Sequence, residues 1–166
     1  MNSYADTSFL VSLYGRDVNN SRSAISLVKK HRPMFRVTPL GETEFTSIVF
    51  AITTRPKGWT VSEAQAIEES FTDDLQAGFW RSEDFPPETW APAREMSRRH
   101  ASALACRALD TLHVASAQIL AADEFYTFDI DQAKLARAAG RLGHLGSSSK
   151  GAFPPFRAFP FVGSSQ

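Results

Sequence analysis

Residues 34–53, MFRVTPLGETEFTSIVFAIT, contain a strand signal and a helix signal in direct succession. The segment Met34–Thr38 shows apolar–polar alternation and lies between two prolines, Pro33 and Pro39, which is typical of a short β-strand. Pro39 suits the first position of a helix, and residues 40–53 continue this helix until the sequence RPKG at 55–58 ends it. This stretch therefore predicts a strand followed directly by a helix.

Strand and helix signals take turns along the rest of the chain as well. The expected strands or extended segments are 2–5, 34–38, 79–85 and 125–128, and the expected helices are 9–14, 21–31, 40–53, 60–78, 88–104, 109–122 and 129–139. Thr60 and Glu63 form a capping-box pattern at the start of one helix, and Gly140 is expected to close the last one. Alternation of this kind predicts an α/β protein, with a parallel sheet and helices on both of its faces.

Composition limits the classes of function. The chain has 166 residues, and its 18 Lys and Arg balance 18 Asp and Glu, so it lacks the strong positive charge of a protein built only to coat nucleic acid or an anionic membrane. No apolar run approaches the roughly 20 residues that span a bilayer. The single cysteine, Cys106, excludes an intrachain disulfide and a zinc site built from cysteines. The first residues lack the basic segment of a signal peptide, so we expect a cytoplasmic protein with no membrane association.

The composition changes near residue 146. Residues 1–145 carry the strand and helix signals, whereas 146–166, GSSSKGAFPPFRAFPFVGSSQ, are rich in Ser, Pro and Phe and show neither pattern. We therefore expect one folded domain at 1–145, followed by a C-terminal tail.

Four carboxylates follow or face the expected strand ends. Asp6 and Asp129 come after the first and last strands, and ligand sites of open parallel sheets lie outside the carboxyl ends of the strands. Glu44 lies in the helix after strand 34–38, and Asp110 lies in the apolar helix before the last strand. Two such charges about 4 Å apart repel by roughly 4 kcal/mol at an effective dielectric near 20. A hard divalent cation removes this repulsion, so the pattern predicts a Mg²⁺ or Mn²⁺ site in one cleft.

Each of these acids also has a purely structural interpretation. Asp6 suits an N-cap, and Asp129 with Gln132 matches a capping box, although a capping carboxylate can leave one oxygen available. Glu44 suits a solvated helix position. Asp110 is harder to explain in this way, because its neighbours are apolar and an unpaired buried acid is costly.

The order of the motifs resembles a known family. The matching segments are YADTSFL at 4–10, TPLGETEF at 38–45, LDTLHVASA at 109–117 and TFD at 127–129. Together they resemble the PIN domain, and more closely the VapC-type toxins of bacterial toxin–antitoxin systems, over about residues 2–145. The resemblance implies a three-layer α/β/α sandwich with a central parallel sheet of about four to five strands. It also implies a Mg²⁺- or Mn²⁺-dependent endoribonuclease that cleaves RNA, forms a homodimer and is inhibited by a cognate antitoxin.

The acidic positions of the family fall on Asp6, Glu44, Asp110 and Asp129. The resemblance implies that Asp6, Asp110 and Asp129 hold the metal and that Glu44 acts as a further ligand or as the base for the attacking water. In-line attack by that water would leave 5′-phosphate and 3′-hydroxyl ends. Glu42 competes with Glu44 for the same motif, and Glu44 is preferred because it precedes the apolar part of the helix.

Several other residues have both a functional and a structural interpretation. Ser8, and less readily Thr7, resembles the hydroxyl that accompanies the first aspartate of the family. Arg98, Arg99 and Arg107 flank the Asp110 segment and suit either RNA phosphates or a solvated surface. His113 lies three residues after Asp110 on the same helix face and suits a role in supporting the site or binding substrate, but we expect a histidine at the edge of the core.

Two other classes of function stay open. The first is a catalytically inactive PIN-like subunit that docks RNA or a protein partner. The second is a magnesium phosphohydrolase, which ranks lower because no Asp-x-Asp-x-Thr motif follows the first strand.

Overall fold

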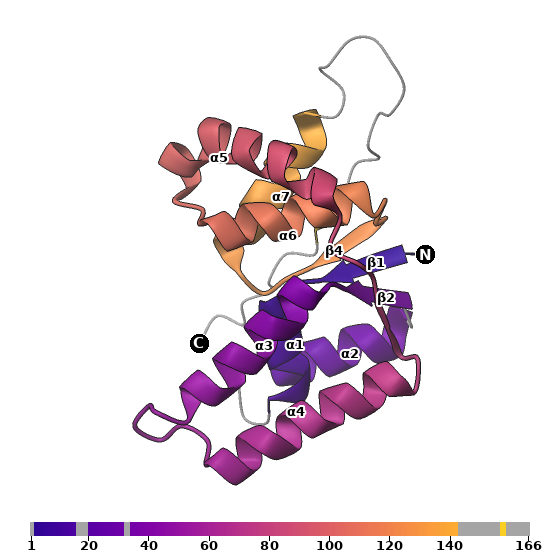
Figure 1. The fold of residues 1–166 in the computed structure, drawn as a ribbon, viewed down its shortest axis with the longest axis vertical. Coiled ribbons are helices and arrows are strands. Elements are labelled where there is room, and N and C mark those ends of the chain that lie inside the picture. Colours follow the sequence, from indigo (N-terminus) through magenta and orange to yellow (C-terminus); the bar gives the residue numbers. More distant parts are fainter. Residues whose placement is uncertain (1, 16–19, 32–33, 143–156, 159–166) are drawn as a thin grey trace. The chain divides into compact units, whose positions relative to one another are not determined.

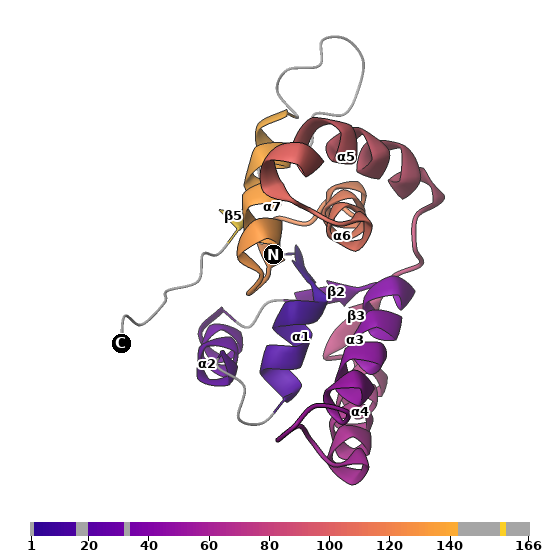
Figure 2. The ribbon, with the colours of Figure 1, turned by 90° about the vertical axis from the view of Figure 1, so that its left-hand side faces the viewer.

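The computed structural model describes residues 2–15, 20–31, 34–142 and 157–158, which divide into two compact units. One unit is Ala5–Asp84, and the other combines Met1–Tyr4 with Phe85–Gln166. Figure 1 and Figure 2 show the elements of each unit in two views. In the described ranges, no helix combines the length and the apolar character that a membrane crossing requires.

The unit Ala5–Asp84 contains four helices and two strands among its described residues. They are α1 (Thr7–Tyr14), α2 (Ser21–His31), β2 (Met34–Val37), α3 (Pro39–Ile52), α4 (Val61–Gln76) and β3 (Trp80–Ser82). The strands β2 and β3 pair in parallel, with Phe35 opposite Trp80. The strand and helix predicted from residues 34–53 are therefore confirmed as β2 and α3.

Local signals explain where these helices begin and end. Pro39 occupies the first turn of α3, and Thr60 and Glu63 form the predicted capping box at the start of α4. Gly15 ends α1: its N–H makes the last helical hydrogen bond, to the Val11 carbonyl at 2.8 Å, and its backbone is extended. A side chain at Gly15 would meet that carbonyl oxygen at 2.5 Å and the ring of Trp59 at 2.8 Å, so a glycine is required there.

An aromatic cluster fills the core of this unit. Phe35 packs on Trp80 at a ring-centroid distance of 4.5 Å, and Phe45 packs on Phe71 at 4.8 Å. Tyr14 lies beside Phe45, Phe71 and Trp80, and its hydroxyl donates to Asp74 at 2.6 Å and accepts from the Trp80 indole N–H. This cluster holds α1, α3 and α4 against β3.

The second unit combines the start of the chain with its C-terminal half. Its elements are the greater part of β1 (Asn2–Ala5), a 3₁₀ turn at Pro87–Thr89, α5 (Trp90–Leu104), α6 (Ala108–Ile119), β4 (Glu124–Tyr126), α7 (Ile130–Leu142) and β5 (Arg157–Ala158). The helices α5, α6 and α7 pack on one another (Figure 1). Every residue from Asp110 to Gln118 is buried, so α6 is the central helix of the three.

The strands β1 and β4 are joined by side chains as well as by the backbone. Tyr4 stacks on Phe125 with a centroid distance of 5.7 Å and an interplanar angle of 6°. The Tyr4 hydroxyl also lies 2.9 Å from Nδ1 of His113, which is 2% exposed. His113 therefore has a structural position, as expected, but it lies inside the core and not at its edge.

The strands have the order β3-β2-β1-β4-β5, and β4 and β5 pair in parallel like β2 and β3. The chain is thus an α/β protein with a central parallel sheet and flanking helices. This confirms the predicted fold class.

Three local expectations are wrong. The last predicted strand, 125–128, is observed at Glu124–Tyr126, because the Thr127 hydroxyl accepts a hydrogen bond from the Asp129 N–H and turns the chain toward α7. Two residues therefore separate Asp129 from the strand. Gly140 does not end α7, because both it and Ala139 are buried and packing outweighs the helix-breaking tendency of glycine.

The third concerns the C-terminal tail at 146–166. Arg157 and Ala158 form β5, opposite Glu124 and Phe125 of β4, although no regular element was expected there. Pairing with β4 gives these two residues backbone hydrogen-bond partners, so this strand depends on its tertiary context and not on its local sequence. The rest of the tail lies outside the described residues, so the division at residue 145 stays a prediction.

Candidate functional site

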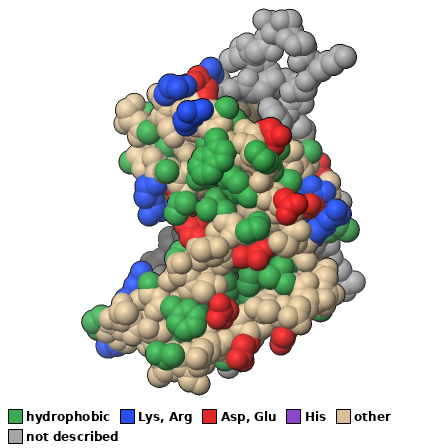
Figure 3. Space-filling view, in the orientation of Figure 1, with side chains coloured by type: hydrophobic (Ala, Val, Ile, Leu, Met, Phe, Trp, Pro, Cys, Tyr) green, Lys and Arg blue, Asp and Glu red, His purple; other side chains and the backbone are tan. Residues whose placement is uncertain are grey.

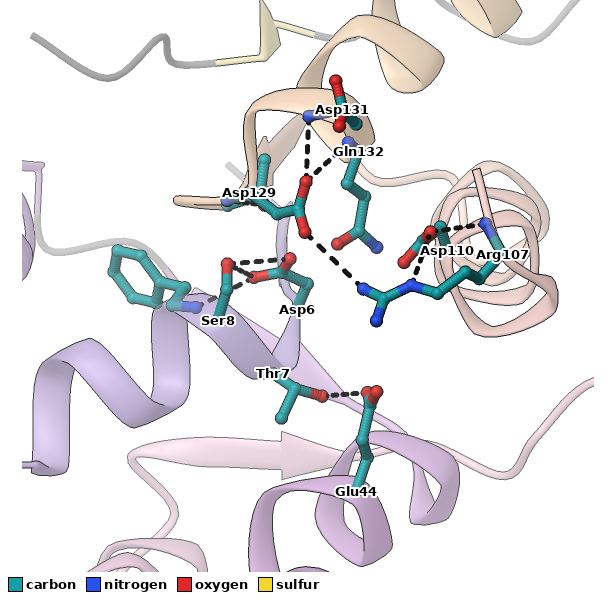
Figure 4. Close-up of polar contacts among 11 residues, drawn as sticks. Asp6, Thr7, Ser8, Glu44, Arg107, Asp110, Asp129, Asp131 and Gln132 are labelled. Carbon is teal, nitrogen blue, oxygen red and sulfur yellow. Dashed lines mark hydrogen bonds and ion pairs between the residues drawn. The ribbon is translucent and has the colours of Figure 1, made fainter. Parts of the chain in front are cut away.

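Asp6 begins α1 and has the capping role that its sequence position suggests. Its Oδ1 accepts from the Phe9 N–H at 2.9 Å, and the whole residue is 1% exposed. The Ser8 hydroxyl donates to Oδ1 at 2.8 Å and to Oδ2 at 3.0 Å (Figure 4). Ser8 is thus the hydroxyl that accompanies Asp6, and these hydrogen bonds fix the orientation of the carboxylate.

Glu44 and Glu42 have different hydrogen-bond partners within this unit. The Thr7 hydroxyl donates to Glu44 Oε2, which places the Glu44 side chain beside the residue that follows Asp6 (Figure 4). Glu42 instead accepts from the Ser82 hydroxyl of β3 at 2.5 Å. The two glutamates therefore point to different parts of the unit, and Glu44 is the one that contacts the start of α1.

Asp110 lies in the first turn of α6, where its carboxylate is paired. Its Oδ2 accepts from the Arg107 backbone N–H at 2.7 Å, and the Arg107 Nε lies 3.5 Å away. The Asp110 side chain is 10% exposed. The helix N-terminus and the guanidinium thus offset the cost of burying this acid among apolar neighbours.

Asp129 is the N-cap of α7, but only half of the predicted capping box is present. Asp129 Oδ1 accepts from the N–H groups of Asp131 and Gln132 at 2.8 and 3.0 Å. The Asp129 N–H donates to the Thr127 hydroxyl at 3.0 Å, which takes the place of the Gln132 side chain in the box.

The Gln132 side chain is consequently left without a capping role. Gln132 is 4% exposed, and among the described residues its Nε2 is buried with no hydrogen-bond partner. An unpaired buried donor is costly and therefore rare in folded proteins. The sequence signal for Gln132 was the capping-box spacing, which pointed to the wrong role.

Arg107 connects two of the predicted site residues. Its Nη2 lies 3.8 Å from Asp129 Oδ2, while its Nε contacts Asp110 (Figure 4). One cation therefore lies close to both carboxylates, which come from the first turn of α6 and the cap of α7.

The predicted site residues thus form two groups. The Asp6 group consists of Asp6, Thr7, Ser8 and Glu44, and the Asp129 group consists of Arg107, Asp110, Asp129 and Gln132. Among the described residues, no set of three or more His, Cys, Asp or Glu side chains forms a group that could hold a metal ion. The three-aspartate ligand set therefore stays a prediction.

The two other candidate arginines have a different surrounding. Arg98 and Arg99 lie on the exposed side of α5, where both pair with Glu95 at 3.0 and 2.5 Å. Figure 3 shows Lys or Arg side chains beside an acidic side chain over α5, in agreement with these two ion pairs. Both arginines lower the pKa of Glu95, the Arg99 hydrogen bond most strongly. Their role in binding RNA stays a prediction.

Cys106 precedes Arg107 and is half-buried. Desolvation by burial, and to a lesser degree the charge of Asp110, raises the pKa of its thiol. A raised pKa disfavours the thiolate, so Cys106 is not an activated nucleophile.

Comparisons with known proteins identify similar structures. VapC20 of Mycobacterium tuberculosis, described as a toxin that cleaves the sarcin–ricin loop, matches with a TM-score of 0.61 and 19% identity, over 80% of this chain and 93% of that chain. VapBC2 of Rickettsia felis, solved with a DNA fragment from its promoter, matches with a TM-score of 0.59 and 13% identity, over 97% and 99% of the two chains. At these identities the similarity concerns the fold. No curated protein sequence gives a significant match.

A family model provides the assignment. The PIN domain model matches residues 3–138, which span β1 to α7 and include all four predicted acidic residues. The chain therefore belongs to the PIN domain family.

Proposed function

We propose that this protein is a metal-dependent endoribonuclease and the toxin of a toxin–antitoxin pair. The observation that carries the proposal is the PIN domain match over residues 3–138, which contains Asp6, Glu44, Asp110 and Asp129 in the expected order. The two similar structures, a toxin that cleaves the sarcin–ricin loop and a VapBC complex, support the toxin assignment. The partners implied are an RNA substrate, a cognate antitoxin and a second copy of the chain.

The donor chemistry of the Asp129 group fits a hard divalent cation. Asp110 and Asp129 offer only carboxylate oxygens, the donor type that Mg²⁺ and Mn²⁺ prefer. The Arg107 guanidinium, itself a cation, lies next to both carboxylates, so this pair already has a positively charged partner. The unpaired Gln132 Nε2 supplies a donor for an oxygen atom of a bound group. In our proposal, Asp110 and Asp129 hold Mg²⁺ or Mn²⁺ together with Asp6.

In this proposal, each site residue has its own role in hydrolysis. The chemistry that a bound divalent ion would supply is a lowered pKa of its water and stabilisation of negative charge on the phosphate. Ser8 orients Asp6 through two hydrogen bonds. Glu44 accepts the proton of the attacking water, and Thr7 holds the Glu44 side chain in place. Gln132 donates a hydrogen bond to a phosphate or water oxygen.

This mechanism needs no help from the RNA 2′-hydroxyl. The water that gives a proton to Glu44 attacks phosphorus, the bond from phosphorus to the 3′-oxygen breaks, and the 3′-oxygen takes a proton from solvent water and leaves as a hydroxyl. The products therefore carry a 5′-phosphate and a 3′-hydroxyl.

The proposal is tested by incubating the purified protein with RNA in Mg²⁺, in Mn²⁺ and in EDTA, followed by mapping of the cleaved ends. We expect cleavage only with a divalent ion, and 5′-phosphate ends. Products with 2′,3′-cyclic phosphates, or equal cleavage in EDTA, would refute the mechanism. Binding of RNA or of a co-purified partner without any cleavage would instead identify a catalytically inactive binding subunit.

A further inference from the structure

Arg107 has an unusual position in the Asp129 group, because its backbone and its side chain contact the same acid. The Arg107 N–H donates to Asp110 Oδ2 at 2.7 Å, and the guanidinium Nε lies 3.5 Å from the same oxygen. The other end of the guanidinium lies 3.8 Å from Asp129 Oδ2. The base of the side chain is therefore anchored at the start of α6, while its positive head lies next to two carboxylates.

The contacts of the guanidinium are loose. Both distances exceed the 2.7–2.9 Å typical of a strong charge-assisted hydrogen bond. The Arg107 side chain is also 77% exposed, and exposed ion pairs of this kind contribute little to stability. The head of Arg107 can therefore leave the carboxylates without much loss of folding free energy, whereas its backbone contact to Asp110 is unaffected.

A divalent ion and the guanidinium are competing ligands for the same pair of charges. Asp110 and Asp129 together carry two negative charges, which one divalent ion balances. A guanidinium that stayed within a few ångströms of that ion would be repelled by it, and water screens this repulsion only in part.

We propose that Arg107 is a built-in competitor of the divalent ion. It neutralises the Asp110–Asp129 pair when the ion is absent, and it moves away when the ion binds. This inference rests on the proposed function, because it assumes that the pair holds the ion. It predicts that the protein binds its ion more weakly than the bare carboxylates would.

The role of Arg107 is distinguishable from that of an ordinary positioning residue. An arginine that only orients Asp110 and Asp129 would strengthen ion binding, so its removal would weaken the affinity. Removal of a competitor would have the opposite effect and would strengthen the affinity for the ion.

The experiment is a titration of the full chain with MnCl₂, in which the free Mn²⁺ is measured by electron paramagnetic resonance. The variants are Arg107→Gln, Arg107→Lys and Arg99→Gln. Arg99→Gln is the matched control, because it removes the same charge from an exposed ion pair on α5. Thermal unfolding of each variant checks that the fold is retained.

We expect Arg107→Gln to lower the Kd for Mn²⁺ by roughly five- to tenfold, the size of a screened charge–charge effect in water-like surroundings. Arg107→Lys keeps the positive charge, and Arg99→Gln removes a charge that pairs with Glu95 on α5, so both variants should stay within about twofold of the unchanged protein. An unchanged or higher Kd in Arg107→Gln, with measurable Mn²⁺ binding in the unchanged protein, would overturn this inference and leave the proposed function intact. Absence of Mn²⁺ binding in both proteins would overturn the inference together with the proposed metal site.

Discussion

Asp129 and Asp131 offer a sharp test of the proposed metal site, because both are acids at the start of α7 but have different partners. Asp129 caps the helix and contacts Arg107, whereas Asp131 pairs with Lys134 at 2.8 Å and its side chain is 56% exposed. The substitutions Asp129→Asn and Asp131→Asn each remove one negative charge from the same turn. Only the first removes a proposed ligand.

The expected effect of Asp129→Asn on stability is small. Asparagine caps a helix about as well as aspartate, so the hydrogen bonds from the N–H groups of Asp131 and Gln132 are retained. The contact with Arg107 at 3.8 Å joins side chains that are 77% and 33% exposed, and such a pair is worth at most about 1 kcal/mol. We therefore expect the unfolding midpoint to fall by no more than about 2–4 °C for a chain of this size.

The expected effect on catalysis is much larger. Loss of a partner that only supports a metal ligand already costs about 10–100-fold, so loss of a ligand itself should lower the cleavage rate at least 100-fold. That factor corresponds to about 2.7 kcal/mol in the activation barrier. Asp131→Asn should change the rate by less than about twofold, since it alters only an exposed ion pair.

The assay compares initial rates of cleavage of a labelled RNA by the three proteins at a saturating Mg²⁺ concentration. Thermal unfolding is measured on the same samples. If Asp129→Asn kept more than a third of the activity while folded, or if Asp131→Asn lost as much as Asp129→Asn, the assignment of Asp129 would be refuted.

Three further predictions concern other residues. Glu44→Gln should abolish cleavage and Glu42→Gln should not, because only Glu44 contacts the start of α1; equal rates in an RNA cleavage assay would contradict this. Gln132→Met removes an unpaired buried donor, so the unfolding midpoint should stay equal or rise while kcat falls about tenfold; an unchanged kcat would exclude Gln132 from the reaction. Desolvation by burial, and then the hydrogen bond to Asp74, raises the pKa of Tyr14 above its ordinary value of 10.0, so the protonated form favours the folded state. The resulting stability is complete below pH 10 and declines as the pH rises further; urea unfolding should therefore show less alkaline loss in Tyr14→Phe, and identical profiles would contradict the assignment.

Local sequence signals predicted most of the elements because each has a local physical cause. Pro39 begins α3 and the Thr60–Glu63 box begins α4, and neither signal depends on distant parts of the chain. The prediction was wrong where distant contacts decide the outcome. The burial of Gly140 keeps α7 helical, and β5 exists because β4 provides a strand to pair with.

The candidate site shows the same division. The order of the motifs was sufficient to select Asp6, Asp110 and Asp129 as candidates, but it did not predict which side chains contact one another. The sequence favoured Glu44 over Glu42 because Glu44 precedes the apolar part of the helix, but it did not predict their contacts with Thr7 and Ser82, which are 37 and 40 residues away along the chain. Gln132 was not considered as a site residue, because its spacing from Asp129 matches a helix capping box.

The contact between Arg107 and Asp129 was missed for a similar reason. These residues are far apart in sequence, and α6 and α7 must pack before they meet. Arg107 was selected as a candidate for binding phosphates, and nothing in the local sequence pointed to its carboxylate partners.

The proposed metal site is tested most directly by a crystal structure of the protein grown with MnCl₂, with diffraction data collected at the manganese absorption edge. We expect an anomalous peak about 2.1 Å from carboxylate oxygens of Asp6, Asp110 and Asp129, with the Arg107 guanidinium turned away from it. A manganese peak bonded to other residues, or no peak beside these three acids at a saturating concentration, would contradict it.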